Sequence, residues 1–154
     1  VLFRSDMKKL LLIGLTVLAV GCATLATYER SATGVVEAIN RGDTGELIER
    51  SRTPFLLDGE IILLDRDIET FWINVVEAGF QVDARDVTAT ELDEQSFQRF
   101  ASTMEVDAFF QKYVDADKGS IVEIRAGNYR ILLLMERAGV GDYQVVGFKG
   151  PDAI

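Results

Sequence analysis

Carboxylates and tyrosines are the side chains of this chain that could carry proton chemistry. Asp86 is the strongest catalytic candidate, because it lies in an alternating apolar stretch, Phe80 to Leu92, where the alternation slips by one position. An extra residue near Arg85 and Asp86, a β-bulge, would bend the strand and re-aim the carboxylate. Buried against aromatic residues, Asp86 could then pass a proton beside a carbonyl group. The alternative is a solvent-exposed Asp86 that pairs with Arg85 or with a neighbouring strand.

Aromatic side chains supply the other candidates for a site. Tyr129 and Tyr113 could donate hydrogen bonds into a pocket, although tyrosines at the edge of a core are the commoner case. The residues expected to line such a pocket are Phe71, Trp72, Phe109 and Tyr113. The alternative for Trp72 is simple packing in the core. Proton transfer by Asp86 with help from Tyr129 is therefore one hypothesis, and a non-catalytic apolar pocket is the other.

Several kinds of site are excluded by residue counts. The chain has no histidine and one cysteine. A Ser–His or Cys–His pair, a His-ligated zinc site and an internal disulfide are therefore impossible. The segment from Asp115 to Ala126 begins like a calcium loop but ends without the bidentate glutamate, so no metal or other cofactor is expected. Charged residues on neighbouring strands are expected to form cross-strand pairs: Glu123, Arg125, Arg130, Glu136 and Arg137.

Length and charge limit the chain to a small number of classes. Its 154 residues, 48% hydrophobic and 27% charged, suit one globular domain. The net charge of −9 argues against nucleic-acid binding, which depends on Lys and Arg neutralising phosphates. The expected division is residues 1–6 as non-native upstream sequence, 7–21 as a signal peptide, 22–30 as a tether, and 31–150 as one α+β domain.

The amino end has the pattern of an export signal. Met7-Lys8-Lys9 is basic, and the apolar run from Leu10 to Val20 is too short to span a bilayer as a helix. The run ends at Ala19-Val20-Gly21-Cys22, which resembles the lipobox of bacterial lipoproteins. That resemblance implies cleavage before Cys22 and attachment of fatty acyl groups such as palmitate to it. The alternative is ordinary secretion, with Cys22 incidental and a soluble periplasmic or secreted product.

The resemblance also implies a destination. The residue after Cys22 is Ala23 and not the aspartate that retains lipoproteins in the inner membrane, so the expected location is the periplasmic face of the outer membrane. Two or more acyl chains would hold the protein stably. Without residues 1–21 the chain has 13 basic and 24 acidic side chains, a charge of −11. Electrostatic attraction to an anionic leaflet would not hold it, so the lipid must.

The element that must position any site is a sheet in the last third of the chain. Residues from Ser120 to Lys149 predict three consecutive antiparallel strands, with Gly127-Asn128 and Gly139 to Asp142 as turns. The middle strand, Tyr129 to Met135, is apolar on both faces, which indicates that both faces are covered.

The preceding residues predict the cover. Spacing indicates a helix from Ser31 to Gly42, and then a short helix capped by Asp43 and ended by Thr53-Pro54. Asp58-Gly59 favours a type I′ hairpin. The next prediction is an amphipathic helix that begins at Asp65 or Asp67, ends at Gly79 and carries an apolar face of Ile68, Phe71, Trp72, Val75 and Val76. The bent strand follows it. The last prediction is a two-part helical segment from Asp93 to Val114, with a capping box at Ser102 to Glu105.

This order of elements resembles the nuclear transport factor 2-like fold over about residues 31–150. The local features that carry the resemblance are Ala38 to Asp43 closing the first helix, Pro54-Phe55 opening the hairpin, and Trp72 in the long helix. The resemblance implies a curved antiparallel sheet that wraps helices into a cone with an apolar pocket. The family includes isomerases and dehydratases as well as binding modules, so the fold does not choose between them.

Two functions follow from these observations. The first is a lipid-anchored periplasmic binding or accessory module, without catalysis, that takes a small apolar ligand or a protein partner and could form a homodimer. The second is a cofactor-independent isomerase or lyase that uses Asp86 as base and a pocket tyrosine. A filled cone with Asp86 in water would argue against the second function.

Overall fold

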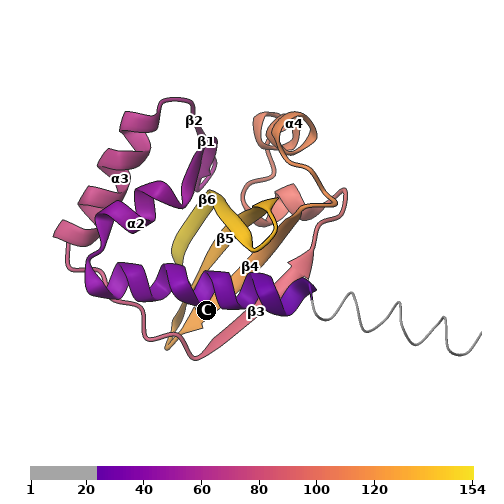
Figure 1. Ribbon diagram of the computed structural model, residues 1–154. Helices are drawn as coiled ribbons and strands as arrows, with labels where there is room; N and C mark the ends of the chain where they lie inside the picture. The colour runs from indigo at the N-terminus through magenta and orange to yellow at the C-terminus, as the bar shows by residue number, and fades with distance from the viewer. Residues whose placement is uncertain (1–23) are drawn as a thin grey trace, which may run out of the picture.

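One curved, unclosed sheet of six strands organises the computed structural model, which describes residues 24–154 (Figure 1). The strands are β1 (Ser51–Leu57), β2 (Glu60–Ile62), β3 (Asp86–Glu91), β4 (Gly119–Ala126), β5 (Tyr129–Gly139) and β6 (Asp142–Ala153). Their order in the sheet is β2-β1-β6-β5-β4-β3. Neighbours run antiparallel except β1 and β6, which are parallel.

Helices cover both faces of this sheet. They are a helix over residues 24–41, α2 (Thr44–Glu49), α3 (Asp65–Glu77), the 3₁₀ helix η1 (Ser96–Arg99) and α4 (Met104–Tyr113). In Figure 1 the helix over residues 24–41 crosses one face of the sheet with α2 and α3 beside it, whereas α4 lies apart from them. The fold is therefore mixed α+β, as the sequence predicts.

The three closing strands pair in sequence order, which confirms the predicted meander. Alternate side chains of β5 enter two separate apolar clusters. Ile131, Leu133 and Met135 face the helix over residues 24–41 and α3, while Leu132 and Leu134 face η1 and α4. The continuous apolar run of β5 thus reflects a strand that is covered on both sides.

The first helix begins earlier than predicted. Residues 24–30 were expected to form a tether, yet they are helical, and Tyr28 is 3% exposed. The Tyr28 hydroxyl donates to the carbonyl oxygen of Lys118, so this turn packs against the start of β4. Polar residues on the outer side of the helix concealed this buried stripe. Gly42, with φ of +69°, ends the helix as predicted.

The second helix is capped as predicted but ends sooner. Asp43 Oδ1 accepts a hydrogen bond from the Glu46 backbone N–H at 3.0 Å. The helix ends at Glu49 and β1 begins at Ser51, so Thr53-Pro54 lies within a strand and does not break a helix. The prediction was wrong here because parallel pairing with β6 extends the chain before the proline.

The predicted hairpin is present, with a different turn. Leu57 pairs with Glu60, which leaves Asp58 and Gly59 as a two-residue turn. A type I′ turn needs positive φ at both residues, whereas here Asp58 has φ of +55° and Gly59 does not have a positive φ. Gly59 lies close to Ala101, because a Cβ atom on it would be 3.2 Å from the Ala101 Cβ. The tip of the hairpin therefore packs beside the segment that precedes α4.

The amphipathic helix α3 packs its predicted face on the sheet. Ile68 and Trp72 are buried, and Phe71 packs against the same cluster. Its N-cap residue is Leu64, without a side-chain cap bond, so neither Asp65 nor Asp67 caps it. Asp65 instead accepts a hydrogen bond from the Thr53 hydroxyl at 2.6 Å, because β1 passes close to the first turn of the helix.

The bent strand is shorter than predicted and has no bulge. β3 pairs with β4 in unbroken register from Asp86 to Glu91, and residues 80–85 lie outside it. Val82 is buried in the core there, and the Asn40 side chain bonds to its backbone. Asn40 Oδ1 accepts from the Val82 N–H at 2.7 Å, and Asn40 Nδ2 donates to the Val82 carbonyl at 2.9 Å. A side-chain amide thus replaces the expected strand neighbour.

The segment between β3 and β4 covers the second face of the sheet. It has the predicted two parts, η1 and α4, but the N-cap residue of α4 is Thr103, one residue after the Ser102 that the predicted capping box requires. Val106 and Phe109 are buried against Leu132 and Leu134 of β5 and their neighbours. This cover creates the groove described below.

Candidate functional site

The proposed catalytic pair does not form a buried site. Asp86 is exposed at the first position of β3, directly across from Arg125 of β4. Among the described residues, its carboxylate accepts one side-chain hydrogen bond, from the Thr88 hydroxyl, and that bond is long at 3.5 Å. The Tyr129 hydroxyl donates to the backbone carbonyl of Gln81 at 3.0 Å. The burial that acid–base chemistry at Asp86 requires is absent, and the alternative, a solvent-exposed aspartate beside a neighbouring strand, is what the structure has.

The four residues expected to line a pocket are packing residues. Trp72 and Phe109 are 0% and 1% exposed, in the two apolar clusters on opposite faces of the sheet. Phe71 packs on Trp72 with ring centroids 4.7 Å apart, and Tyr113 packs on Phe109 at 5.7 Å. None of the four lines the hollows described below.

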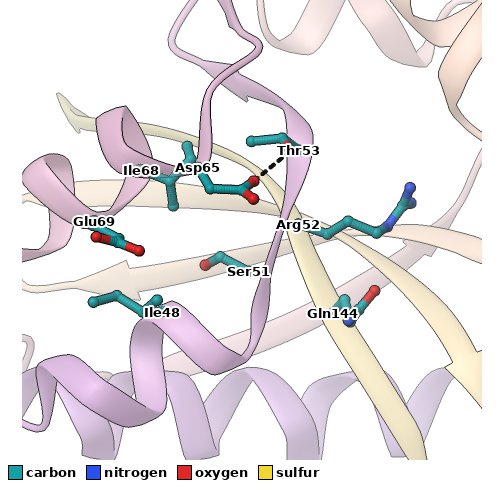
Figure 2. Close-up of a pocket in the computed structure, with 8 residues that line it drawn as sticks. All are labelled: Ile48, Ser51, Arg52, Thr53, Asp65, Ile68, Glu69 and Gln144. Carbon is teal, nitrogen blue, oxygen red and sulfur yellow. Dashed lines mark hydrogen bonds between the residues drawn. The ribbon is translucent and has the colours of Figure 1, made fainter.

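A small polar hollow of about 360 Å³ opens between β1 and α3 (Figure 2). We call it the β1 hollow; its lining residues are Ile48, Ser51, Arg52, Thr53, Asp65, Ile68, Glu69 and Gln144. Figure 2 shows the Thr53–Asp65 hydrogen bond on one side of the hollow and Glu69 on another. The side chain of Ser51 points from β1 toward the helices.

Several polar side chains of the β1 hollow are bound to other groups of the protein. Ser51 Oγ donates to the Leu47 carbonyl and accepts from Trp72 Nε1, both at 2.8 Å. Its proton is therefore held by a backbone oxygen and is not directed to a base. Arg52 is bound to Glu136 at 2.9 Å. The arrangement fixes the indole of Trp72 beneath β1, which is a structural role.

A larger groove, of about 690 Å³, lies beside α4. We call it the α4 groove; its lining residues are Leu92, Asp93, Glu94, Phe97, Asp107, Phe110, Gln111, Val114 and Ala116. Residues 92–94 follow β3, Phe97 belongs to η1, and Asp107 to Val114 belong to α4 and its C-cap. Three elements that are contiguous in sequence therefore form its walls.

Apolar and acidic side chains line the α4 groove together. Leu92, Phe97, Phe110 and Val114 are half-buried, each packed against the cluster beneath α4, and we call them its floor. Three acidic residues line the same groove, Asp93 and Glu94 exposed and Asp107 half-buried, and we call them its rim. The volume lies within the range of about 300–1,000 Å³ that is typical of ligand sites. The arrangement can bind an apolar group that is accompanied by positive charge.

Sequence reasoning did not find this groove. The apolar residues of α4 were visible as two aromatic turns, but the helical period did not show which of them the sheet leaves partly uncovered. The available signal was an acidic run at Asp93-Glu94 next to Phe97, followed by Asp107 next to Phe110. Within this one helical segment, carboxylates therefore lie near an aromatic residue at two places.

A second hollow adjoins the groove, since Leu92 and Ala116 line both. Thr24, Leu25 and Tyr28 of the first helix form its other wall. Burial of the Tyr28 ring raises the pKa of its phenol, and the nearby Tyr143 hydroxyl raises it further. Because the two hollows share lining residues, Thr24, Leu25 and Tyr28 lie next to the α4 groove.

The charges around Glu123 of β4 are matched. Glu123 binds Arg125 of its own strand at 2.7 Å, Arg99 of η1 at 3.0 Å and Arg130 of β5 at 3.7 Å. The hydrogen bond from Arg125 lowers the pKa of Glu123, and attraction to the other two guanidinium groups adds to this effect. The cross-strand pairing predicted for Glu123 is confirmed, whereas Glu136 pairs with Arg52 of β1 and not with a neighbouring strand.

Residues 24–154 hold no cluster of three or more acidic, cysteine or histidine side chains that could bind a metal ion. In the same residues no helix is both long and apolar enough to cross a membrane. Cys22 and the predicted signal, residues 7–21, lie outside the described part of the chain. Comparison of the chain with protein-family models, with curated proteins and with solved structures gives no match.

Proposed function

We propose that this chain is a non-catalytic binding module that is held at the periplasmic face of the outer membrane by lipid on Cys22 and engages a partner through the α4 groove. The observation that carries the proposal is the composition of the groove, in which four half-buried apolar side chains are open to solvent within a rim of carboxylates. Apolar area of this kind gains free energy when a partner covers it.

The interior of the domain supports binding over catalysis. Trp72, Phe55 and Phe148 fill the space between α3 and the sheet, each at most 2% exposed. Asp86 is exposed, and in the β1 hollow the side chains of Ser51, Thr53 and Asp65 are bound to other groups of the protein. A fully buried carboxylate without a bonding partner, beside an open cavity, would have favoured an isomerase or lyase.

The finer fold assignment is part of the proposal. Two helices, a hairpin, a long helix and a strand followed by a meander occur in the order of the nuclear transport factor 2-like fold. The curved, unclosed sheet is compatible with that cone. In this protein aromatic packing would close the wide end of the cone. The binding surface would lie on the opposite face of the sheet, beside α4.

The proposed anchor would keep the groove close to the membrane. Cys22 precedes Thr24 by two residues, so their Cα atoms are at most about 7 Å apart. Thr24 lines the hollow that adjoins the groove. A lipid on Cys22 would therefore restrict the partner to molecules that reach the bilayer surface on the same side.

A photocrosslinking experiment tests the groove. Gln111 is exposed, lines the groove and bonds only to Asp107 among the described residues. Gln98 is exposed on η1, outside the groove. With benzoylphenylalanine at either position of the full chain in a bacterial host, we expect a discrete adduct at position 111 that mass spectrometry identifies, and none at position 98. Adducts of equal yield at both positions, or none at 111, would contradict a partner in the groove.

The anchor is tested by replacing Cys22. We expect Cys22→Ser to move the protein from the membrane fraction to the soluble periplasm, because loss of the acyl chains removes about 0.8 kcal/mol of membrane affinity per buried methylene group. Mass spectrometry of the wild-type protein from the membrane fraction should show an acylated Cys22 as the first residue. An unmodified wild-type protein in the soluble fraction would contradict the anchor and leave the groove result unaffected.

A further inference from the structure

Resting on the proposed function, we propose that the partner inserts into the α4 groove a peptide segment in which apolar side chains are flanked by Lys or Arg. The groove supplies both kinds of contact, an apolar floor and an acidic rim. The inference concerns the chemistry of the partner, which the proposed function leaves open.

The apolar contact comes from side chains that the fold leaves unfinished. Phe97 and Phe110 pack against the cluster beneath α4, and the Phe110 ring lies 6.0 Å from that of Phe100 and 6.2 Å from that of Phe109. Their outer sides, with those of Leu92 and Val114, remain half-exposed in the groove. Leucine- or phenylalanine-sized side chains of a partner would complete this packing.

The charge of the groove is not balanced within the described protein. Asp93, Glu94 and Asp107 form no ion pair with any Lys or Arg of residues 24–154. Lys112, on the next position of α4 after Gln111, lies 5.0 Å from the centre of the Tyr113 ring. Glu123, by contrast, is surrounded by three arginines.

The three carboxylates differ in what they do for the fold. Asp93 Oδ1 accepts from the Gln95 N–H and the Ser96 hydroxyl, so it supports the turn before η1. Among residues 24–154 the Asp107 carboxylate accepts a single hydrogen bond, from Gln111, although it is half-buried. Glu94 is exposed and makes no hydrogen bond or ion pair with the described residues. Glu94 and Asp107 are therefore available to a cationic side chain.

Electrostatics of the whole chain favour the same partner. The net charge of −9 would slow the approach of nucleic acids, fatty acids and other anions and accelerate that of cations. An open groove between a loop and a helix accepts an extended or helical segment lengthwise, in which apolar anchors and positive residues alternate. A protein segment that carries Lys or Arg beside Leu or Phe meets both requirements at once.

The test uses three labelled peptides and the full chain in phosphatidylcholine nanodiscs, whose neutral surface does not attract cations. The probe is Lys-Leu-Phe-Lys-Leu-Phe, and the comparison peptides replace either both Lys by Gln or all apolar residues by Ser. We expect fluorescence anisotropy to give a Kd about tenfold lower for the Lys-Leu-Phe peptide than for either comparison peptide, because two partly desolvated ion pairs contribute roughly a factor of ten. Empty nanodiscs correct for binding to lipid.

Matched variants assign this binding to the groove. Glu94→Gln with Asp107→Asn removes both available charges and keeps the side-chain shapes, and it should raise the Kd of the Lys-Leu-Phe peptide about tenfold. The control, Glu60→Gln with Glu77→Gln, removes two exposed charges elsewhere and should leave the Kd unchanged. Gln111→Arg, which places a cation in the groove, should weaken binding, whereas Gln98→Arg should not.

Two results would overturn the inference. One is equal binding of the Gln-containing and Lys-containing peptides, or no binding by either, and the other is binding that persists in the Glu94→Gln, Asp107→Asn protein. Either result leaves the proposed function standing if crosslinking at position 111 still yields a discrete adduct. Loss of that adduct would instead overturn the proposed function itself, so the two failures are distinguishable.

Discussion

Replacing Trp72 by alanine is expected to lower the free energy of unfolding by about 3–5 kcal/mol, which would leave a domain of this size barely folded. Trp72 is fully buried between α3 and the sheet, with its ring perpendicular to that of Phe148 at 5.8 Å. Alanine would remove this packing and leave a cavity that α3 cannot close, because Ile68 and Phe71 are already packed on either side of it. Urea unfolding followed by circular dichroism measures the change.

Two further variants separate packing from hydrogen bonding. Trp72→Phe keeps most of the ring but loses the bond from Nε1 to Ser51 Oγ, and should cost about 1 kcal/mol for that bond in addition to a small packing loss. Ile73→Ala lies on the same helix at a position that is 40% exposed, and should cost less than about 1 kcal/mol. Equal losses for Trp72→Ala and Ile73→Ala would contradict the position of α3 on the sheet.

Replacing Glu123 by glutamine should destabilise the domain near neutral pH by about 1–3 kcal/mol, because Arg99, Arg125 and Arg130 would lose their shared anion. The Glu123 side chain is 15% exposed, so water only partly replaces the lost contacts. Glutamine has the same shape, and the effect therefore reports the charge and not the packing. Glu60→Gln, which removes an exposed carboxylate that forms no ion pair with residues 24–154, serves as the control and should change stability by less than about 0.5 kcal/mol.

The same variant predicts a dependence on pH. The folded-state pKa of Glu123 is lowered below the ordinary value of 4.5, so its carboxylate stabilises the fold fully above that pH and loses the contribution as the pH falls through the folded-state pKa. The stability difference between wild type and Glu123→Gln should therefore be largest near pH 7 and shrink below about pH 4.5. A difference that stays constant down to about pH 3 would show that the effect of the substitution does not come from the charge of Glu123.

Local patterns in the sequence predicted the elements that repeat with a clear period. The apolar face of α3, the strand β5 with both faces buried, and the Asp43 cap all depend on residues within a few positions of one another. Short-range spacing determines which side of a helix or strand is apolar. For that reason the meander and the two-part segment before β4 were predicted correctly.

The predictions that failed depend on neighbours distant in the sequence. Residues 24–30 looked polar, yet Tyr28 is buried because Lys118 and Tyr143 lie against it. The alternation from Phe80 predicts a strand, but the strand begins only at Asp86. Before it, the backbone of Val82 bonds to the side-chain amide of Asn40 and not to a partner strand. No local pattern records which distant residue will satisfy a backbone group.

The sequence by itself determined the mixed α+β class, the closing meander and the apolar faces that must be buried, because these follow from periodicity and turn chemistry. Only the tertiary structure decided that Trp72 and Phe109 are packed in cores while Phe97 and Phe110 remain partly uncovered beside Glu94 and Asp107. In the sequence, each of these four aromatic residues lies in an apolar helical stretch that is equally compatible with a core position or a groove position. Whether such a residue fills a core or lines a groove depends on how completely the opposing surface covers it, and that surface is assembled only when the chain folds.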